Sequence, residues 1–324
     1  MAKLESRTLP SINGFLNMYK PAGITSMDAV RRVKRLSGQR QKVGHGGTMD
    51  PLARGVLPIC FGQATRLMDY LVDGPKRYLV EIRLGVTTAT YDAEGEVVKT
   101  RDVGGVTRQM IETTLQSFIG AIAQTPPMYS AVKVDGQRLY KLARAGIEVE
   151  REARPVDIYN IRVLDFASPT LVLDVDSGRG VYMRSLAHDL GEALGCGGHV
   201  TDLVRLYCGG FRAEEAVTLE QLEQANASDP DGWRQHLRPI DWVLRDLKSI
   251  AVGPQAEKYL RNGQSINLGQ PAVDAGYLET FRAYSSDGRF LALVRFDRPA
   301  NAWQPIKVFQ IDSPSPHAPV SSVS

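Results

Sequence analysis

The chain is poor in the features that mark exported, membrane-bound or metal-binding proteins. Its 324 residues contain three cysteines, an odd number without the paired spacing of zinc ligands, and five scattered histidines. No apolar run approaches the roughly 20 residues of a membrane-spanning helix, and Met1 to Leu9 lack the apolar core of a signal peptide. These absences predict a cytoplasmic protein with no membrane partner and no metal site.

The chain also has little net charge, +3, so its total charge does not indicate a nucleic-acid partner. The distribution is more informative, because residues 31–42 carry six basic side chains and no acid. These six are Arg31, Arg32, Lys34, Arg35, Arg40 and Lys42. A solvated helix face and a surface for phosphates both explain this run.

Hydrophobic periodicity predicts alternating helices and strands. Thr25 and Asp28 have the spacing of a capping box, and the apolar residues that follow predict a helix over 27–36 that ends near Ser37-Gly38. Alternation over 76–86 predicts a strand with Tyr78 on its buried face. Other segments predict helices over 106–119 and 184–194 and a strand over 171–175. Such interleaving indicates an α/β or α+β fold.

Two stretches stand apart from this pattern. Residues 124–154 are basic and interrupted by prolines, which fits a mobile arm that contacts phosphates or an ordinary surface insertion. Residues 248–312 contain short β-like stretches between turn residues, which predicts a small β-barrel domain. The stretches are 266–268, 278–284, 290–296 and 306–311. The proline- and serine-rich tail from Ser313 is predicted to be disordered.

Asp50 lies in a glycine-rich loop, residues 44–58, directly after the basic run. An aspartate before Pro51 is a good helix cap, so capping is one interpretation of Asp50. Chemistry on a nucleic acid is the other, since a carboxylate is an unusual group in a surface for polyanions. The loop lacks both the Gly-Lys-Ser/Thr and the G-x-G-x-x-G phosphate patterns, which argues against a nucleotide cofactor.

Three further residues each have two interpretations. Arg184 begins a predicted helix, where the macrodipole disfavours a cation, so it has either a specific anionic partner or a frayed surface position. Tyr78 is either a core tyrosine or a ring that stacks on a base. His45, between glycines, could stack or donate a hydrogen bond.

Five ordered segments resemble the motifs of the bacterial tRNA pseudouridine-55 synthase family, the TruB family. They are the lysine-proline motif (14–26), the catalytic loop (44–58), the tyrosine motif with its acidic turn (76–78 and 90–96), an RNA-gripping insertion (124–140) and the arginine motif (180–186). The resemblance implies an α+β fold with a mixed, mostly antiparallel central sheet flanked by helices. It also implies a catalytic domain over 1–245, with an RNA-gripping insertion at about 124–154, a PUA-like β-barrel over 246–312 and a tail over 313–324.

The resemblance further implies isomerisation of the T-arm uridine of tRNA, uridine-55, to pseudouridine without metal or organic cofactor. Asp50 would attack the flipped nucleoside at the sugar C1′ or by a route through a glycal. Arg184 would pair with Asp50, Tyr78 would stack on the base, and His45 would fill the vacated space. Tyr182 and Leu203 match pocket positions, and Lys20, Lys133 and Arg138 are expected to bind RNA. The partner would be tRNA, bound by a monomer.

Two alternatives stay open at the level of sequence: a non-catalytic RNA-binding or RNA-folding protein on the same scaffold, and a sibling synthase acting on another RNA. The chain also departs from the family pattern in three places. Val204 stands where the family often has an arginine, Phe290-Leu291 lacks the usual following glycine, and Met49 replaces a common leucine.

Overall fold

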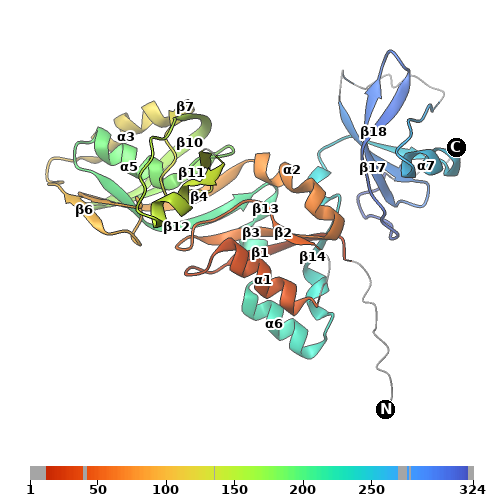
Figure 1. Ribbon diagram of the computed structural model, residues 1–324, viewed down its shortest axis with the longest axis horizontal. Coiled ribbons are helices and arrows are strands. Elements are labelled where there is room, and N and C mark those ends of the chain that lie inside the picture. The colour runs from red at the N-terminus through yellow and green to blue at the C-terminus, as the bar shows by residue number, and fades with distance from the viewer. Residues whose placement is uncertain (1–11, 39–41, 135, 269–275, 277–278, 320–324) are drawn as a thin grey trace.

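The computed structural model describes residues 12–38, 42–134, 136–268, 276 and 279–319 (Figure 1). Arg40 of the basic run and Leu278 of a predicted strand therefore lie outside the described residues. No helix within these ranges has the length and apolar character needed to cross a membrane.

A large mixed sheet organises the first three-quarters of the described chain. Its order is β14 (Leu237–Pro239), β1 (Gly14–Lys20), β3 (Arg54–Phe61), β12 (Gly198–Cys208), β4 (Lys76–Leu84), β11 (Thr170–Ser177), β10 (Arg154–Ala167) and β7 (Gly120–Gln124). Two shorter strands, β2 (Val43–His45) and β13 (Phe211–Arg212), pair with β3 and β12. Only β3 and β12 pair in parallel among these neighbours, so the predicted mixed, mostly antiparallel sheet is confirmed.

Helices cover the apolar face of this sheet. At one end lie α3 (Arg108–Leu115) and α5 (Met183–Ala193), and at the other α1 (Ser26–Leu36) and α6 (Leu219–Ser228) (Figure 1). The alternating residues Val80, Ile82 and Leu84 of β4 are buried with Leu186 and Leu190 of α5. This contact buries the face that the sequence pattern predicted to be internal. The short α2 (Met68–Asp73) follows a 3-10 turn at Gly62–Leu67.

The first helix follows its sequence pattern closely. The Thr25 hydroxyl accepts from the Asp28 N–H at 3.1 Å, and the Asp28 carboxylate accepts from the Thr25 N–H at 3.2 Å, so the predicted capping box is confirmed. Ala29, Val30 and Val33 are buried. The basic residues of α1 are therefore left on the exposed side of the helix.

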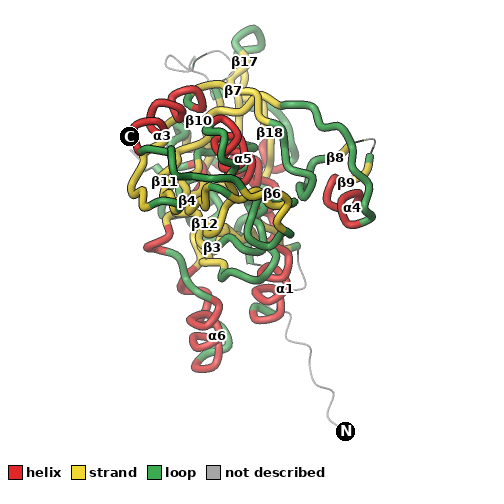
Figure 2. The backbone as a smooth tube through the Cα atoms, turned by 90° about the vertical axis from the view of Figure 1, so that its left-hand side faces the viewer, coloured by secondary structure: helices red, strands yellow, loops and turns green. Residues whose placement is uncertain are grey.

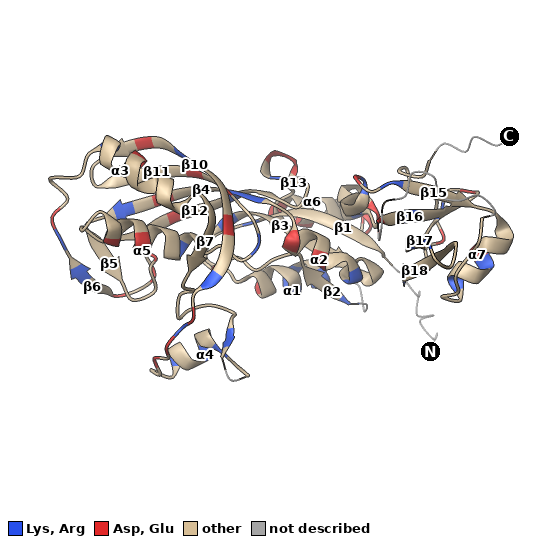
Figure 3. Cartoon of the chain, turned by 90° about the horizontal axis from the view of Figure 1, so that it is seen from above, with Lys and Arg blue, Asp and Glu red and all other residues tan. Residues whose placement is uncertain are grey.

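The other predicted elements appear within a few residues of their expected bounds. Strand β4 ends at Leu84 because Gly85 takes a positive φ of 88°. A separate hairpin of β5 (Val86–Thr88) and β6 (Val97–Thr100) follows. Residues 124–154 contain β8 (Lys133–Val134), β9 (Gln137–Arg138) and α4 (Leu139–Arg144), and α4 projects away from the sheet (Figures 2 and 3).

A four-stranded sheet forms the C-terminal domain, in the order β15 (Ser249–Val252), β16 (Thr280–Ser285), β17 (Phe290–Asp297) and β18 (Ala302–Val308). Ile266, where another strand was predicted, makes one isolated bridge to Trp303. The region also contains a helix that the sequence analysis did not predict, α7 (Pro254–Arg261). This helix is short and buries only Leu260, which leaves a weak periodic signal.

The tail was predicted to be disordered, and its described part, residues 313–319, corrects this. The Ser315 hydroxyl donates to the buried Asp241 carboxylate, and the His317 ring lies 5.5 Å from that of Trp242. Residues 313–319 are held because Asp241 offers a buried acceptor that the tail sequence alone does not reveal.

The two sheets share an apolar cluster. Phe15 and Val56 of the large sheet belong to it together with Tyr284, Phe290 and Phe309 of the C-terminal domain, and all five are fully buried. Gln63 also exchanges two hydrogen bonds, at 2.7 and 3.0 Å, with the backbone of Gln310. The C-terminal domain is thus packed against the first domain through a continuous core.

Candidate active site

The loop that carries Asp50 connects β2 to β3 and is held by hydrogen bonds to the first residue of α1 and to the segment before that helix. The Ser26 hydroxyl accepts from the Met49 N–H at 2.8 Å, and the Gly23 N–H donates to the Pro51 carbonyl at 2.9 Å. Residues 51–53 form a bend that leads into β3, and no helix begins after Asp50. The structure therefore does not support a helix cap as the role of Asp50.

Lys20 lies beneath this loop. We predicted that Lys20 would contact RNA, and the structure corrects this, because Lys20 is fully buried. Its ammonium donates to the carbonyls of Pro21 and Ile24 at 2.8 Å and of Pro51 at 3.2 Å. Burial lowers the pKa of Lys20 to about 8, and the Asp50 charge opposes the change. Lys20 therefore holds the loop from inside, and its charge does not face solvent.

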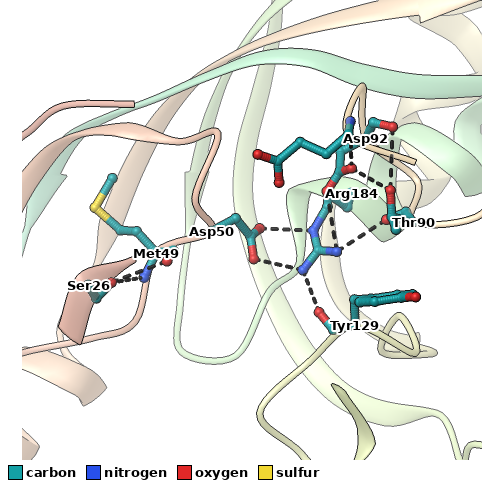
Figure 4. Close-up of polar contacts among 8 residues, drawn as sticks. Ser26, Met49, Asp50, Thr90, Asp92, Tyr129 and Arg184 are labelled. Carbon is teal, nitrogen blue, oxygen red and sulfur yellow. Dashed lines mark hydrogen bonds and ion pairs between the residues drawn. The ribbon is translucent and has the colours of Figure 1, made fainter. Parts of the chain in front are cut away.

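Asp50 and Arg184 form a bidentate ion pair (Figure 4). The Arg184 Nε donates to one Asp50 carboxylate oxygen at 2.9 Å, and Nη2 donates to the other at 2.7 Å. The Arg184 side chain is 3% exposed, whereas that of Asp50 is 29% exposed. The carboxylate thus keeps an open side while its orientation is fixed by a planar guanidinium.

Arg184 has further partners on two other segments. It donates to the carbonyls of Thr90 at 3.1 Å and Tyr129 at 2.7 Å, and lies 3.5 Å from a carboxylate oxygen of Asp92. Arg184 lies in the first turn of α5, where the helix dipole disfavours a cation, and these acceptors offset that effect. Arg184 therefore has the specific anionic partner that one interpretation of the sequence predicted. The frayed-surface alternative is wrong.

Burial controls the electrostatics of Asp50. Removal from water raises the pKa of Asp50 above its ordinary value, and the Arg184 guanidinium opposes that rise. The buried Asp92 carboxylate adds to the rise, because a second negative charge nearby disfavours ionisation. The carboxylate is therefore more basic than an exposed aspartate while it stays paired with a cation.

Tyr78 and the loop that carries His45 both lie beside a buried arginine, Arg205. Arg205 of β12 pairs in register with Tyr78 of β4, and it donates from Nε to the Val56 carbonyl at 2.7 Å and from Nη2 to the Gly47 carbonyl at 3.1 Å. Burial raises the pKa of Tyr78, and Arg205 opposes this change. Burial lowers the pKa of His45, and the nearby Arg205 charge lowers it further. The neutral imidazole is therefore favoured.

The remaining predicted residues fall into two groups. Tyr182 caps α5, and its N–H donates to the Gln124 side chain at 2.8 Å, while Leu203 is 4% exposed in the main core. Lys133 and Arg138 are exposed and pair across the β8–β9 hairpin. The structure thus brings Asp50 and Arg184 into direct contact and leaves the pocket and RNA roles of these four residues as predictions.

Sequence reasoning assigned no role to Asp92, Tyr129 or Arg205. Asp92 had a usable signal, since it lies in an acidic turn that follows the tyrosine strand. Tyr129 contributes a backbone carbonyl, which carries no sequence signal. A buried arginine in a strand, such as Arg205, looks like an exposed one until its partners are known.

Comparison with known proteins gives the family. Residues 34–183 match the family described as TruB family pseudouridylate synthase (N terminal domain), and residues 184–245 match the tRNA pseudouridylate synthase B C-terminal domain. A protein of Dehalococcoides mccartyi named tRNA pseudouridine synthase B is 43% identical over 95% of this chain and 100% of its own length. The chain belongs to the TruB family of pseudouridylate synthases.

Other relatives extend over most of this TruB-family chain. The protein named tRNA pseudouridine synthase B of Clostridium acetobutylicum is 40% identical over 87% of this chain and 95% of its own. A chain in the crystal structure of a Cbf5-Nop10-Gar1 complex superposes with a TM-score of 0.69 at 25% identity, and the match covers 95% of this chain and 87% of that one. The predicted family and fold are thus confirmed.

Val204, the departure from the TruB pattern, is 6% exposed in β12 and pairs with Arg54 of β3 and Leu79 of β4. A valine there is covered by its neighbours, so it presents no charge to a substrate.

Proposed function

We propose that this TruB-family chain is a tRNA pseudouridine synthase that isomerises uridine-55 in the T-arm. The observation that carries the proposal is the bidentate pair between Asp50 and Arg184, in which the aspartate alone keeps an exposed side. A carboxylate that is fixed, partly desolvated and open on one side suits nucleophilic attack. A protein that only binds RNA has no need for such a group beside a phosphate-binding surface.

The proposed chemistry conserves all atoms of the nucleoside. Attack by the Asp50 carboxylate on C1′ breaks the bond between C1′ and N1, and the electron pair leaves with uracil. Uracil rotates within the pocket, and C5 then bonds to C1′ and displaces the carboxylate. Loss of the C5 proton and gain of a proton at N1 complete the isomer. In the glycal route Asp50 removes the C2′ proton as uracil departs, and the proton returns to C2′ when C5 bonds to C1′.

Tyr78 and His45 complete the proposed site. The Tyr78 ring would stack on the flipped uracil, and its raised pKa keeps the phenol protonated, which suits a ring beside the Asp50 carboxylate. His45, neutral and half-buried, would fill the space that the base leaves in the RNA loop. Extrusion of a base costs a few kcal/mol, which stacking and backbone contacts must offset.

RNA contacts are proposed outside this site. The exposed basic residues of α1 and the hairpin with Lys133 and Arg138 would contact phosphates of the T-arm. The C-terminal sheet, proposed as PUA-like, would contact the acceptor side of tRNA. The chain would act as a monomer in the cytoplasm.

Tritium release from 5-tritiated uridine in a T-arm stem-loop tests the proposal, because the C5 proton is lost in the reaction. We expect release from wild type and from Asp246→Asn, which makes the same chemical change at an exposed carboxylate. Asp50→Asn should bind the RNA and release no tritium. Normal release by Asp50→Asn would overturn the nucleophile, and tight binding without release by wild type would indicate a binding protein. A stem-loop with cytidine at position 55 should give no release.

A further inference from the structure

The turn at residues 90–92 presents both the Thr90 carbonyl and the Asp92 carboxylate to Arg184 (Figure 4). Between them, Tyr91 has a φ of 63°, the left-handed region that residues other than glycine rarely adopt. A strained backbone persists only where its surroundings determine it, and strain of this kind clusters at functional sites. Contacts of both its backbone and its side chain hold Tyr91 in this conformation.

The backbone of Tyr91 makes two hydrogen bonds. The Tyr91 N–H donates to the Thr88 carbonyl at 3.2 Å, and the Tyr91 carbonyl accepts from the Val200 N–H at 3.1 Å. The first bond ties the turn to the end of β5, and the second ties it to β12. They do not involve α5, the helix on which Arg184 lies.

The side chain supplies the link to α5. The Tyr91 ring stacks on the His188 ring with centroids 3.9 Å apart and planes 8° from parallel. His188 follows Arg184 by four residues, so both project from one face of the helix. Arg184 thus holds the two ends of the turn while His188 holds its middle. Both rings are half-exposed, so they add little to the hydrophobic core.

We infer that Tyr91 and His188 are positioning residues: their stack fixes the turn that aligns Arg184 on Asp50. The inference rests on the proposed function. The stack touches no reacting group, so it acts on the rate through Arg184. The role belongs to the ring faces, because stacking needs neither the imidazole charge nor the tyrosine hydroxyl.

The test compares His188→Ala, which removes the stack, with His188→Phe, which restores a ring. A matched control is Glu192→Gln. Glu192 also lies on α5, and its carboxylate accepts two hydrogen bonds, at 2.6 and 3.0 Å, from Arg101, the residue that follows β6 and lies away from the turn. Single-turnover tritium release and RNA affinity are measured for each. We expect His188→Ala to slow release about tenfold with affinity within about twofold of wild type. His188→Phe and Glu192→Gln should stay within about threefold of the wild-type rate.

A double-mutant cycle identifies the route of action. In an Asp92→Asn background the turn no longer presents a negative charge to Arg184. There, His188→Ala should slow tritium release by less than about a further twofold. Wild-type release with an unchanged rate in His188→Ala would overturn this inference and leave the proposed function intact. So would equal slowing by Glu192→Gln, additive losses in the cycle, or a loss confined to RNA affinity. No release by wild type would refute the proposed function itself.

Discussion

At the scale of single residues, burial and Arg184 have opposite effects on the pKa of Asp50, and this predicts a pH dependence of the reaction rate. Burial raises the pKa of Asp50, and the reactive form is the carboxylate, so the rate should fall as the pH decreases through that raised value. The acid limb should therefore lie above the ordinary aspartate value of about 3.9. Single-turnover tritium release against pH, with folding checked by circular dichroism, measures the limb. A rate that stays constant down to the ordinary value would contradict the expectation.

Arg184 sets the position of that limb. Arg184→Met removes the cation that opposes the rise, so the acid limb should move to higher pH and the maximal rate should fall by at least about a hundredfold. The matched control is Arg179→Met, whose exposed guanidinium pairs with Asp73 at 2.7 Å away from the site. An unchanged limb in Arg184→Met would show that Asp50 is not governed by this pair.

Lys20 gives a prediction about stability. Lys20→Met removes the Lys20 donor from the Pro21, Ile24 and Pro51 carbonyls, of which, within the described part of the chain, only that of Pro51 keeps another donor, the Gly23 N–H. We therefore expect a loss of about 2–4 kcal/mol in the free energy of unfolding. Urea denaturation measures the loss. Lys34→Met, a change at an exposed lysine of α1, should alter stability by less than about 0.5 kcal/mol. Equal stability of the two variants would contradict the assigned role of Lys20.

The sequence predicted the pairing of Asp50 with Arg184 but not the groups around it. Asp50 and Arg184 lie 134 positions apart, and their pairing followed from ordered motifs and from a cation misplaced at a helix start. The burial of Lys20 and the stack of Tyr91 on His188 could not be predicted, because each depends on which distant segments meet. Periodicity reports the face on which a residue lies and does not identify its partner.

At the scale of elements, the hairpin of β8 and β9 predicts salt-dependent binding. Replacing both Lys133 and Arg138 by glutamine should weaken binding to a T-arm stem-loop and reduce the slope of log affinity against log salt by about 1–2. The rate at saturating RNA should not change, because neither side chain lies in the contacts around Asp50. Filter binding at several salt concentrations checks this, with Lys99→Gln on the exposed strand β6 as control. An unaltered salt slope would remove these residues from the RNA surface.

Local signals explain which elements were predictable. The helix α1 carries a capping box and a clean apolar stripe, and its bounds were predicted to within a residue. The helix α7 has a Pro at its first position but only one buried residue, so its short pattern resembled a loop between strands. Elements that owe their stability to local sequence were found, and those held by tertiary packing were missed.

At the scale of the whole molecule, the shared apolar cluster predicts cooperative unfolding. Because Phe15 and Phe309 belong to one core, separation of the domains would expose apolar surface on both. We expect one calorimetric transition with equal calorimetric and van't Hoff enthalpies. Two resolved transitions would show that the domains unfold independently.

A buried hydrogen bond at the junction gives a second prediction. The Tyr284 hydroxyl donates to Asp241 at 2.6 Å, and both residues are fully buried. Tyr284→Phe removes this donor and should lower the free energy of unfolding by about 1–3 kcal/mol. Tyr259→Phe, at an exposed tyrosine of α7, should leave stability within about 0.5 kcal/mol of wild type. Comparable losses in the two variants would contradict the assigned role of the bond.

The bond that Ser315 makes to Asp241 has a consequence for engineering and inheritance. The segment after β18 returns to the junction between the two domains, so the C-terminal sheet cannot be exchanged among relatives as an independent domain. A transplanted sheet would need its own tail and an acceptor that matches it on the recipient. Substitutions in the tail and in the 237–247 segment should therefore be inherited as compatible sets.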